Sequence, residues 1–533
     1  MGRSVACAGD VNGDGYSDVI VGAHLYDGGQ GNEGAIFIYH GSASGLSASY
    51  NAIAESNNTN ANLGYCVSSA GDVNADGYSE VIAGAIQYSN GNLGEGAFFV
   101  YHGSASGIST TPAAIVEGNQ TSAVMGISVA SAGDVNGDGY SDVIAGARDY
   151  FNGELDEGRA YVYHGSATGI NTTANSIIEN NQASAFLGFS VCSAGDVNGD
   201  GFSDVAVGAV NHDNGELNEG AVFIYHGSAA GINITAAAML ENNLASAGFG
   251  FAVSCAGDVN GDGYSDLLVG STGYQNGQFL EGAFFLYYGA ASGINTTAAF
   301  MAESNQAGAN FGYAVACAGD VNGDGYSDVI VSGYQYSNGE AGEGVGFIYY
   351  GAASGISGPA SAMLESNQAS AVLTSVASAG DVNGDGYSDI IRGYVAFDNG
   401  ELNEGAAFVN LGNSPGTNQP NNLRLYNTDL TTPLNSSNFI FSNFGAGLYA
   451  KSFLGRAKGK LVWETRLNYN VYSGTPITNS TFFTAQQASY TDMGLIGIEL
   501  KNVIDKVAGA SRFTKLRARI KYDPVTSITG QVY

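Results

Sequence analysis

Apolar and polar residues follow one another in short blocks along the first 411 residues, and the order of the blocks repeats. A run of small residues such as 65–70 precedes an acidic loop, and a short apolar run such as 19–21 follows it. Next come an Asn-Gly-type turn, an aromatic and aliphatic run such as 97–101, and a last apolar run such as 114–116. Each unit therefore predicts four short β-strands with turns between them, and no run has helical periodicity.

The acidic loop carries the pattern Asp-Val-Asn-Gly-Asp-Gly-Tyr-Ser-Asp or a close variant of it. It begins at Asp10, Asp72, Asp134, Asp196, Asp258, Asp320 and Asp381. The spacing is 62 residues five times and then 61, and a fixed period of this length predicts a solenoid, a propeller or an array. Four strands per repeat favour a seven-bladed β-propeller over residues 1–411, because a closed ring leaves no open sheet edge.

Two shorter elements recur around the loop. Phe-Gly or a relaxed form of it stands at 63–64, 125–126, 187–188, 249–250 and 311–312, and Gly-Ala stands at 22–23, 84–85, 146–147 and 208–209. With the loop, in this order and at this period, the repeats resemble the FG-GAP repeats of integrin α-subunit propellers and their bacterial relatives. Departures fall late in the region, at 331–333, at 392–394 and near 372–373, so the seventh blade is the least regular.

The way the ring would close is left open by the sequence. Met1 stands at the start of an inner strand, so no N-terminal strand is available to complete the last blade. Residues 422–427 fall where the seventh repeat should place its fourth strand. Either this segment completes the blade, or a piece upstream of Met1 does.

Each acidic loop is a candidate calcium site. In the first loop Asp10, Asn12, Asp14 and Asp18 take positions 1, 3, 5 and 9, and Tyr16 at position 7 can offer its backbone carbonyl. Oxygen ligands in a flexible site with several carboxylates suit calcium, whereas zinc and copper prefer nitrogen and sulfur. Position 12 carries no acid in any repeat, which excludes an EF-hand.

Carried over position by position, the resemblance implies up to seven calcium ions, one for each blade. The predicted ligands are Asp10, Asn12, Asp14, Tyr16, Asp18, Asp72, Asn74, Asp76, Tyr78, Glu80, Asp134, Asn136, Asp138, Tyr140, Asp142, Asp196, Asn198, Asp200, Phe202, Asp204, Asp258, Asn260, Asp262, Tyr264, Asp266, Asp320, Asn322, Asp324, Tyr326, Asp328, Asp381, Asn383, Asp385, Tyr387 and Asp389. The second site is expected to be the weakest, since Glu80 replaces the last Asp and Ala75 the usual Gly. The alternative is an acidic turn without metal, but seven copies of three carboxylates would repel one another.

The charge distribution fits this picture. Residues 1–411 carry 43 acidic and four basic residues, whereas residues 412–533 carry six acidic and 13 basic ones. So acidic a first part argues against nucleic-acid binding and favours cations or basic partners. The five cysteines include no CxxC pair and predict buried thiols rather than a disulfide framework.

Other residues recur in register with the loops. One glutamate series precedes the third strand, at Glu33, Glu95, Glu157, Glu219, Glu281, Glu343 and Glu404, and another ends the fourth strand, at Glu55, Glu117, Glu179, Glu241, Glu303 and Glu365. Their repetition indicates a structural task such as bonding a turn, because an enzyme gathers a few unique groups in one pocket. An aromatic position also recurs, at Tyr26, Tyr88, Tyr150, His212, Tyr274, Tyr336 and Phe397. These rings pack blade against blade, or they form an acidic and aromatic rim that binds a partner.

Residues 412–422 predict a linker, and 423–533 predict a β-sandwich-like accessory domain. Leu461, Trp463, Thr465 and Leu467, with Tyr469 and Val471 beyond them, alternate with more polar residues, as do Leu516, Ala518, Ile520 and Tyr522, which predicts two half-buried strands. Residues 500–507 could form a short helix. The basic face of Arg517, Arg519 and Lys521 is a solvated face or docks on the acidic propeller.

Taken with the resemblance, these features predict a calcium-binding, extracellular or cell-surface adhesion or ligand-binding module. Its ligand would be a protein or glycan on the rim opposite the calcium loops, as the resemblance to integrins implies. No catalytic motif and no stretch of 18 apolar residues occurs, so we expect no enzyme and no membrane span. The alternative is the propeller part of a secreted enzyme that acts on polysaccharide.

Overall fold

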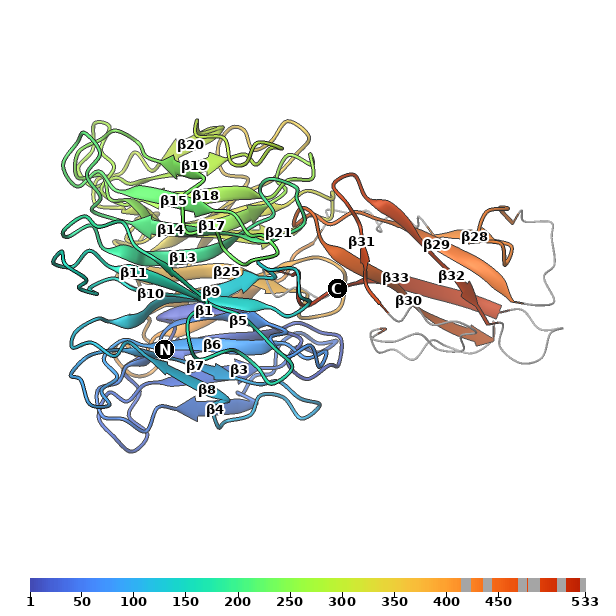
Figure 1. Ribbon diagram of the computed structural model, residues 1–533, viewed down its shortest axis with the longest axis horizontal. Helices are drawn as coiled ribbons and strands as arrows, with labels where there is room; N and C mark the ends of the chain where they lie inside the picture. The colour runs from blue at the N-terminus through green and yellow to red at the C-terminus, as the bar shows by residue number, and fades with distance from the viewer. Residues whose placement is uncertain (414–422, 435–442, 468–476, 478–488, 506–513, 528–533) are drawn as a thin grey trace.

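The computed structural model describes residues 1–413, 423–434, 443–467, 477, 489–505 and 514–527. Every secondary-structure element within these ranges is a β-strand, which confirms the all-β prediction. The repeat region forms seven antiparallel sheets, and a smaller group of strands stands at one end of them (Figure 1). The first part of the chain is a β-propeller.

Each repeat sheet keeps the order of the chain, so its first strand is innermost and its last strand outermost. The first three sheets consist of β1 (Ser4–Gly9), β2 (Asp18–Ala23), β3 (Ala35–Tyr39) and β4 (Ala52–Glu55); β5 (Leu63–Gly71), β6 (Glu80–Ala85), β7 (Ala97–Tyr101) and β8 (Ala114–Glu117); and β9 (Met125–Gly133), β10 (Asp142–Ala147), β11 (Arg159–Tyr163) and β12 (Ser176–Ile178). The next three consist of β13 (Leu187–Gly195), β14 (Asp204–Ala209), β15 (Ala221–Tyr225) and β16 (Ala238–Leu240); β17 (Phe249–Gly257), β18 (Asp266–Ser271), β19 (Ala283–Tyr287) and β20 (Phe300–Glu303); and β21 (Phe311–Gly319), β22 (Asp328–Gly333), β23 (Val345–Tyr349) and β24 (Ala362–Glu365). The seventh sheet has three strands, β25 (Leu373–Gly380), β26 (Asp389–Tyr394) and β27 (Ala406–Asn410).

The position of a strand in its sheet explains its composition. Second strands such as β2 and β6 are buried at every residue, because a neighbouring sheet covers each face, and after the acid with which each begins they are apolar. First strands are rich in small residues and surround a channel of about 360 Å³, and the five cysteines, all free thiols, are among the residues of its wall. Small side chains are needed there because the innermost strands of all the sheets converge.

Glycines make the closest contact between neighbouring sheets. A Cβ atom added to Gly146 in β10 would lie 1.9 Å from the carbonyl oxygen of Gly188 in β13. The same pairing recurs as Gly22 with Gly64, Gly84 with Gly126, Gly208 with Gly250, Gly270 with Gly312 and Gly393 with Gly2. Glycines at the Phe-Gly and Gly-Ala positions are therefore partners across six of the seven sheet boundaries, which explains why both recur.

The seventh sheet lies against the first. The backbone N–H of Val5 donates to Ser375 Oγ (3.1 Å), Thr374 Oγ1 donates to the Gly2 carbonyl (3.1 Å), and the Met1 ammonium donates to the Glu404 carbonyl (2.8 Å). Of the two sources expected for a fourth strand, residues 422–427 do not supply it. Their described part forms β28 (Arg424–Tyr426), which pairs with a strand of the smaller group instead.

The smaller group of strands forms two three-stranded sheets, β28–β29–β32 and β31–β30–β33. The remaining strands are β29 (Phe444–Ala450), β30 (Lys458–Leu467), β31 (Thr491–Asp492), β32 (Ile498–Ile504) and β33 (Thr514–Tyr522). Both sheets contribute to one core around the fully buried Trp463, as expected of a sandwich-like domain. The linker predicted at 412–422 falls mostly on residues that lie outside the described ranges.

Two predictions for this C-terminal domain can be compared with the structure. The alternating segments are confirmed as β30 and β33, which pair with Trp463 opposite Ala518, although Tyr469 and Val471 lie outside the described residues. The short helix suggested for 500–507 is wrong. Leu500, Asn502 and Ile504 are buried while the residues between them are half-exposed, so the period is two and the segment is strand β32.

Candidate metal centre

The nine-residue loops join the first strand of each repeat sheet to the second. Position 1 directly follows the first strand, and position 9 begins the second, as Asp18 does in β2. In the first loop Asp10 accepts backbone N–H donors from Asp14 and Gly15, at 3.0 and 2.9 Å. Asp18 accepts from Val11 and Gly41, both at 2.9 Å. The acids therefore fold the loop around themselves and direct several carboxylates to one place.

Neighbouring loops are also bonded to one another. The position 8 serine of each loop donates its backbone N–H to the carbonyl of position 1 in the preceding loop. These pairs are Ser79 to Asp10, Ser141 to Asp72, Ser203 to Asp134, Ser265 to Asp196, Ser327 to Asp258, Ser388 to Asp320 and Ser17 to Asp381, with distances of 3.0–3.2 Å. The seven loops thus form one hydrogen-bonded series.

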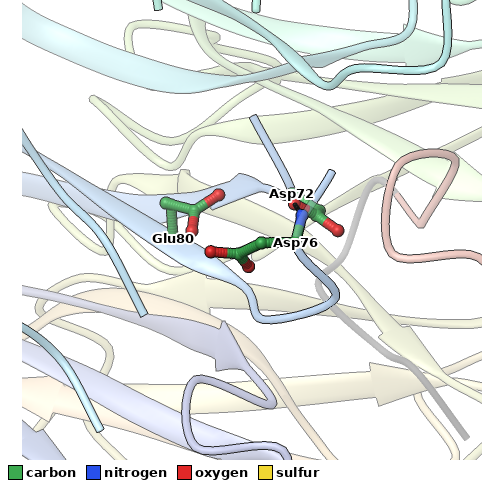
Figure 2. Close-up of side chains that lie close together, drawn as sticks. All are labelled: Asp72, Asp76 and Glu80. Atoms are coloured by element: carbon green, nitrogen blue, oxygen red, sulfur yellow. Dashed lines mark hydrogen bonds between the residues drawn. The ribbon is translucent and has the colours of Figure 1, made fainter. Parts of the chain in front are cut away.

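The second loop brings its acids closest together. Carboxylate oxygens of Asp72, Asp76 and Glu80 all lie within 4.8 Å of one another (Figure 2). Within the described ranges, it is the one group of three or more His, Cys, Asp or Glu residues with such a spacing. Glu80 reaches further into the loop than an aspartate would, because its side chain is one carbon longer. These oxygens fit a calcium ion, while the ranking of this site as the weakest stays a prediction.

Burial changes the protonation of the position 9 acids. Burial raises the pKa of Asp142 and of Asp328 to about 8. Burial, and next the neighbouring Asp72, raise the pKa of Glu80 to about 9. Carboxylates this far from water hold protons at neutral pH unless a cation compensates their charge. The loops therefore have the electrostatic character of cation sites.

The aromatic residue at position 7 covers the preceding loop. Its ring lies where a Cβ atom at position 4 of that loop would point, so that a Cβ on Gly13 would lie 2.7 Å from the Tyr78 ring. Position 4 also has a left-handed backbone, with φ of 72° at Gly13 and 57° at Ala75. Glycine suits both the close contact with the ring and the left-handed backbone. Ala75 is the one non-glycine residue at position 4 of the seven loops, and it has the same left-handed backbone.

We expect Ala75→Gly to stabilise the second loop. A left-handed backbone is unfavourable for an L-residue by about 1–2 kcal/mol, and the greater freedom of glycine in the unfolded chain offsets part of that gain. The free energy of unfolding, measured in urea at fixed calcium, should rise by about 0.5–1 kcal/mol. Ala105→Gly is the control, because Ala105 is exposed and has an ordinary backbone, and it should bring no gain. An equal effect of both changes would contradict this explanation.

The recurring glutamates have the structural task that their repetition indicates. Glu33 is fully buried, and its Oε1 accepts the backbone N–H groups of Gly28 and Gly29, both at 2.7 Å. In the second series, Glu117 accepts from the Asn90 side chain at 2.7 Å. Both series hold the turn between the second and third strands, at the end of the sheet opposite the acidic loop.

The recurring aromatic residues pack differently from either interpretation. Each stacks edge-on against an aromatic residue of the third strand in its own sheet, as Tyr88 does on Phe99 with centroids 5.6 Å apart. The other pairs are Tyr26 with Phe37, Tyr150 with Tyr161, His212 with Phe223, Tyr274 with Phe285, Tyr336 with Phe347 and Phe397 with Phe408. These rings brace a hairpin, so packing between blades is not their main contact.

Five exposed apolar side chains were not predicted from the sequence. Leu93, Leu155, Leu217, Phe279 and Leu402 occupy the same place in the turn between the second and third strands, and each is 63–80% exposed. The signal was present in the sequence, since each stands two residues before a glutamate of the first recurring series. We call these five residues the apolar crown.

Comparisons with known proteins agree with this architecture. The FG-GAP repeat family matches residues 2–39 and 125–163, and the FG-GAP-like repeat family matches 196–269 and 258–331. The chain contains FG-GAP repeats. No long apolar helix that could cross a membrane is found in the described part of the chain.

The FG-GAP region is similar to integrin α-subunits. It is 33% identical to integrin α-3 of Cricetulus griseus over 214 residues, which cover 39% of this chain and 19% of that protein. It is 31% identical to integrin α-V of Gallus gallus over 244 residues, which cover 44% of this chain and 22% of that protein. The matches therefore span about a fifth of the length of these two relatives. A solved structure of BBS1N with ARL6DN covers 73% of this chain and 88% of that chain at 8% identity, and its TM-score of 0.42 is too low to support any argument.

Proposed function

We propose that this protein is a non-catalytic, calcium-binding recognition module that acts outside the cell or on its surface. The observation that carries the proposal is the acidic loop, repeated seven times with a fully buried acid at position 9 in every copy. Similarity to integrin α-subunits supports divalent cations as the ligands of these loops. Extracellular calcium modules bind at about 10⁻⁴–10⁻³ M, which suits loops without a strong bidentate acid at position 12.

We further propose that the seven sheets are seven blades of one closed ring. The bonds between Val5 and Ser375, and between Met1 and Glu404, support this, because they join the first sheet to the last. Calcium would then hold one end of every blade, through the residues at positions 1, 3, 5, 7 and 9 of each loop. The metal would be structural, and the opposite end of the ring would be available for recognition.

The recognition surface, in this proposal, is centred on the apolar crown. The turns that carry it lie at the end of each sheet opposite the calcium loops, because successive strands are antiparallel. Four of these large apolar side chains stand at matching positions on four successive blades, and Leu402 stands on the seventh, which exceeds the scattered exposure that is normal for a soluble protein. Glu154 and Asp156 flank Leu155, so a partner with apolar and basic groups would complement this surface. A protein ligand fits this description better than a neutral glycan.

The proposal can be tested with the full chain on an array of extracellular proteins and glycans, with calcium and with a chelator. We expect a calcium-dependent protein ligand whose affinity falls at least tenfold in the double variant Leu155→Ser, Leu217→Ser. Ile496→Ser is the control, because Ile496 is 80% exposed in the C-terminal domain. The calcium-dependent rise in melting temperature should be unchanged in both variants. Binding that survives both the chelator and the double variant would contradict the proposal.

A further inference from the structure

The C-terminal domain rests on the calcium loops of the third, fourth and fifth sheets. Lys458 Nζ lies 3.9 Å from Asp134 Oδ2 of the third loop, and Lys451 Nζ lies 3.4 Å from Asp258 Oδ2 of the fifth. Between them along the chain, Arg456 Nη1 donates to the Gly199 carbonyl of the fourth loop at 2.6 Å. One segment, 451–458, thus places a cation on each of three successive loops.

The contact extends beyond these charges. The Phe453 carbonyl accepts the backbone N–H of Asp258 at 2.8 Å and Ser327 Oγ at 2.6 Å. In the seventh loop the corresponding backbone N–H, that of Asp381, donates instead to the position 8 serine of the neighbouring loop, Ser17. The Phe453 carbonyl therefore replaces the hydrogen bond that would join the fifth and sixth loops here. Segment 451–458 is thus in direct contact with the fifth loop.

The cations lie close to where calcium would bind. A calcium ion bound to Asp258 at the usual 2.3–2.6 Å would be within about 6 Å of the Lys451 ammonium. Two positive charges at this separation repel strongly near a protein surface. Salt reduces this repulsion little, because the screening length of about 8 Å exceeds the distance between the charges. The Asp258 side chain is fully buried, so it cannot turn into solvent to relieve this repulsion.

We infer that Lys451, Arg456 and Lys458 lower the calcium affinity of the fifth, fourth and third loops, so that calcium and the docked C-terminal domain oppose each other. This inference rests on the proposed calcium function. Linkage requires the effect to be mutual: if docking weakens calcium binding tenfold, calcium weakens docking tenfold. The C-terminal domain then acts as an internal regulator of calcium occupancy on one side of the ring.

The chain contains its own internal comparison. The fifth and sixth loops have the same nine residues, at 258–266 and 320–328. No lysine or arginine within the described ranges forms an ion pair with Asp320, the first residue of the sixth loop. Any difference in calcium affinity between these two loops must therefore come from their surroundings.

The test is hydrogen exchange of the full chain, followed by mass spectrometry across a calcium titration. Peptides that cover the fifth and sixth loops are distinguished by their flanking residues. In the wild type, the fifth loop should gain protection at about tenfold higher calcium than the sixth. Lys451→Gln should lower the midpoint of the fifth loop about tenfold and leave the sixth unchanged. As calcium rises, amides at 451–457 should lose protection in the wild type.

Lys501→Gln is the matched control, because Lys501 pairs with Glu499 inside the C-terminal domain. It should leave both midpoints unchanged. A fifth-loop midpoint that stays in place in Lys451→Gln, or moves to higher calcium, would overturn the inference while the calcium function stands. If no loop gains protection at any calcium concentration, the proposed function itself fails.

Discussion

Removing calcium should lower the melting temperature of the whole protein by about 10 °C. A site filled at ten times its dissociation constant stabilises the folded state by roughly 1.4 kcal/mol, and seven sites together by about 10 kcal/mol. This is comparable with the stability of an ordinary domain. Divided by the entropy of unfolding of about 400 residues, this free energy corresponds to a shift in the melting temperature of roughly 10 °C. Scanning calorimetry in 1–2 mM calcium and in excess chelator measures it directly.

Two controls make this result specific. Returning excess calcium should restore the melting temperature, whereas the same concentration of magnesium should restore little, because magnesium demands a tighter octahedral site. In Asp138→Asn, which removes one carboxylate from the third loop, the shift between calcium and chelator should shrink by about a seventh. Thermal unfolding that is indifferent to the chelator would refute calcium at these loops.

The second large effect is expected from Gly146→Ala. The added Cβ would stand 1.9 Å from the Gly188 carbonyl oxygen, and no rotamer change relieves the clash, because the position of a Cβ is fixed by its own backbone and the oxygen belongs to the backbone. Neighbouring sheets would have to move apart, and we expect a loss of about 3 kcal/mol or more in the free energy of unfolding. Urea denaturation at constant calcium, followed by circular dichroism, measures the change.

Gly29→Ala is the matched control for this substitution. Gly29 has no atom within 4 Å of its added Cβ and no left-handed backbone, so its change should stay within about 0.5 kcal/mol of the wild type. Equal stabilities of the two variants would mean that the glycine contact is not what spaces the sheets.

The repeat region was predictable from sequence because its determinants are local. A turn glycine, an acidic loop and a short apolar run specify each strand within a few residues, and seven copies remove the ambiguity of one. The contact of Gly146 with Gly188 was not predicted, although both glycines were noticed, because a motif does not reveal which partner it touches. The same holds for Tyr88, whose ring packs within its own hairpin.

The C-terminal domain was harder to predict because it occurs once. Of the predicted basic face, Arg517 pairs with Glu464 of the same domain at 2.6 Å, whereas the ammonium of Lys521 interacts with Asp10 and Asp72 of the loops, as docking on the propeller requires. Lys451 and Lys458, which reach the loops, stand in a short segment without periodicity. Contacts between residues some 190 and 320 positions apart leave no pattern in the local sequence. The segment at 500–504 was misread because the polar Asn502, and not Val503, occupies the buried face, which hides the period of two.

The series of serine-to-aspartate bonds between loops has no first or last member. In an open stack of repeats, the terminal units have one neighbour each, fray first and need polar caps. Here the bond from Ser17 to the Asp381 carbonyl gives the first loop the same two neighbours as every other. In the closed ring proposed above, an ion lost from any loop would be felt on both sides, and no loop would be a terminal unit from which unravelling could start.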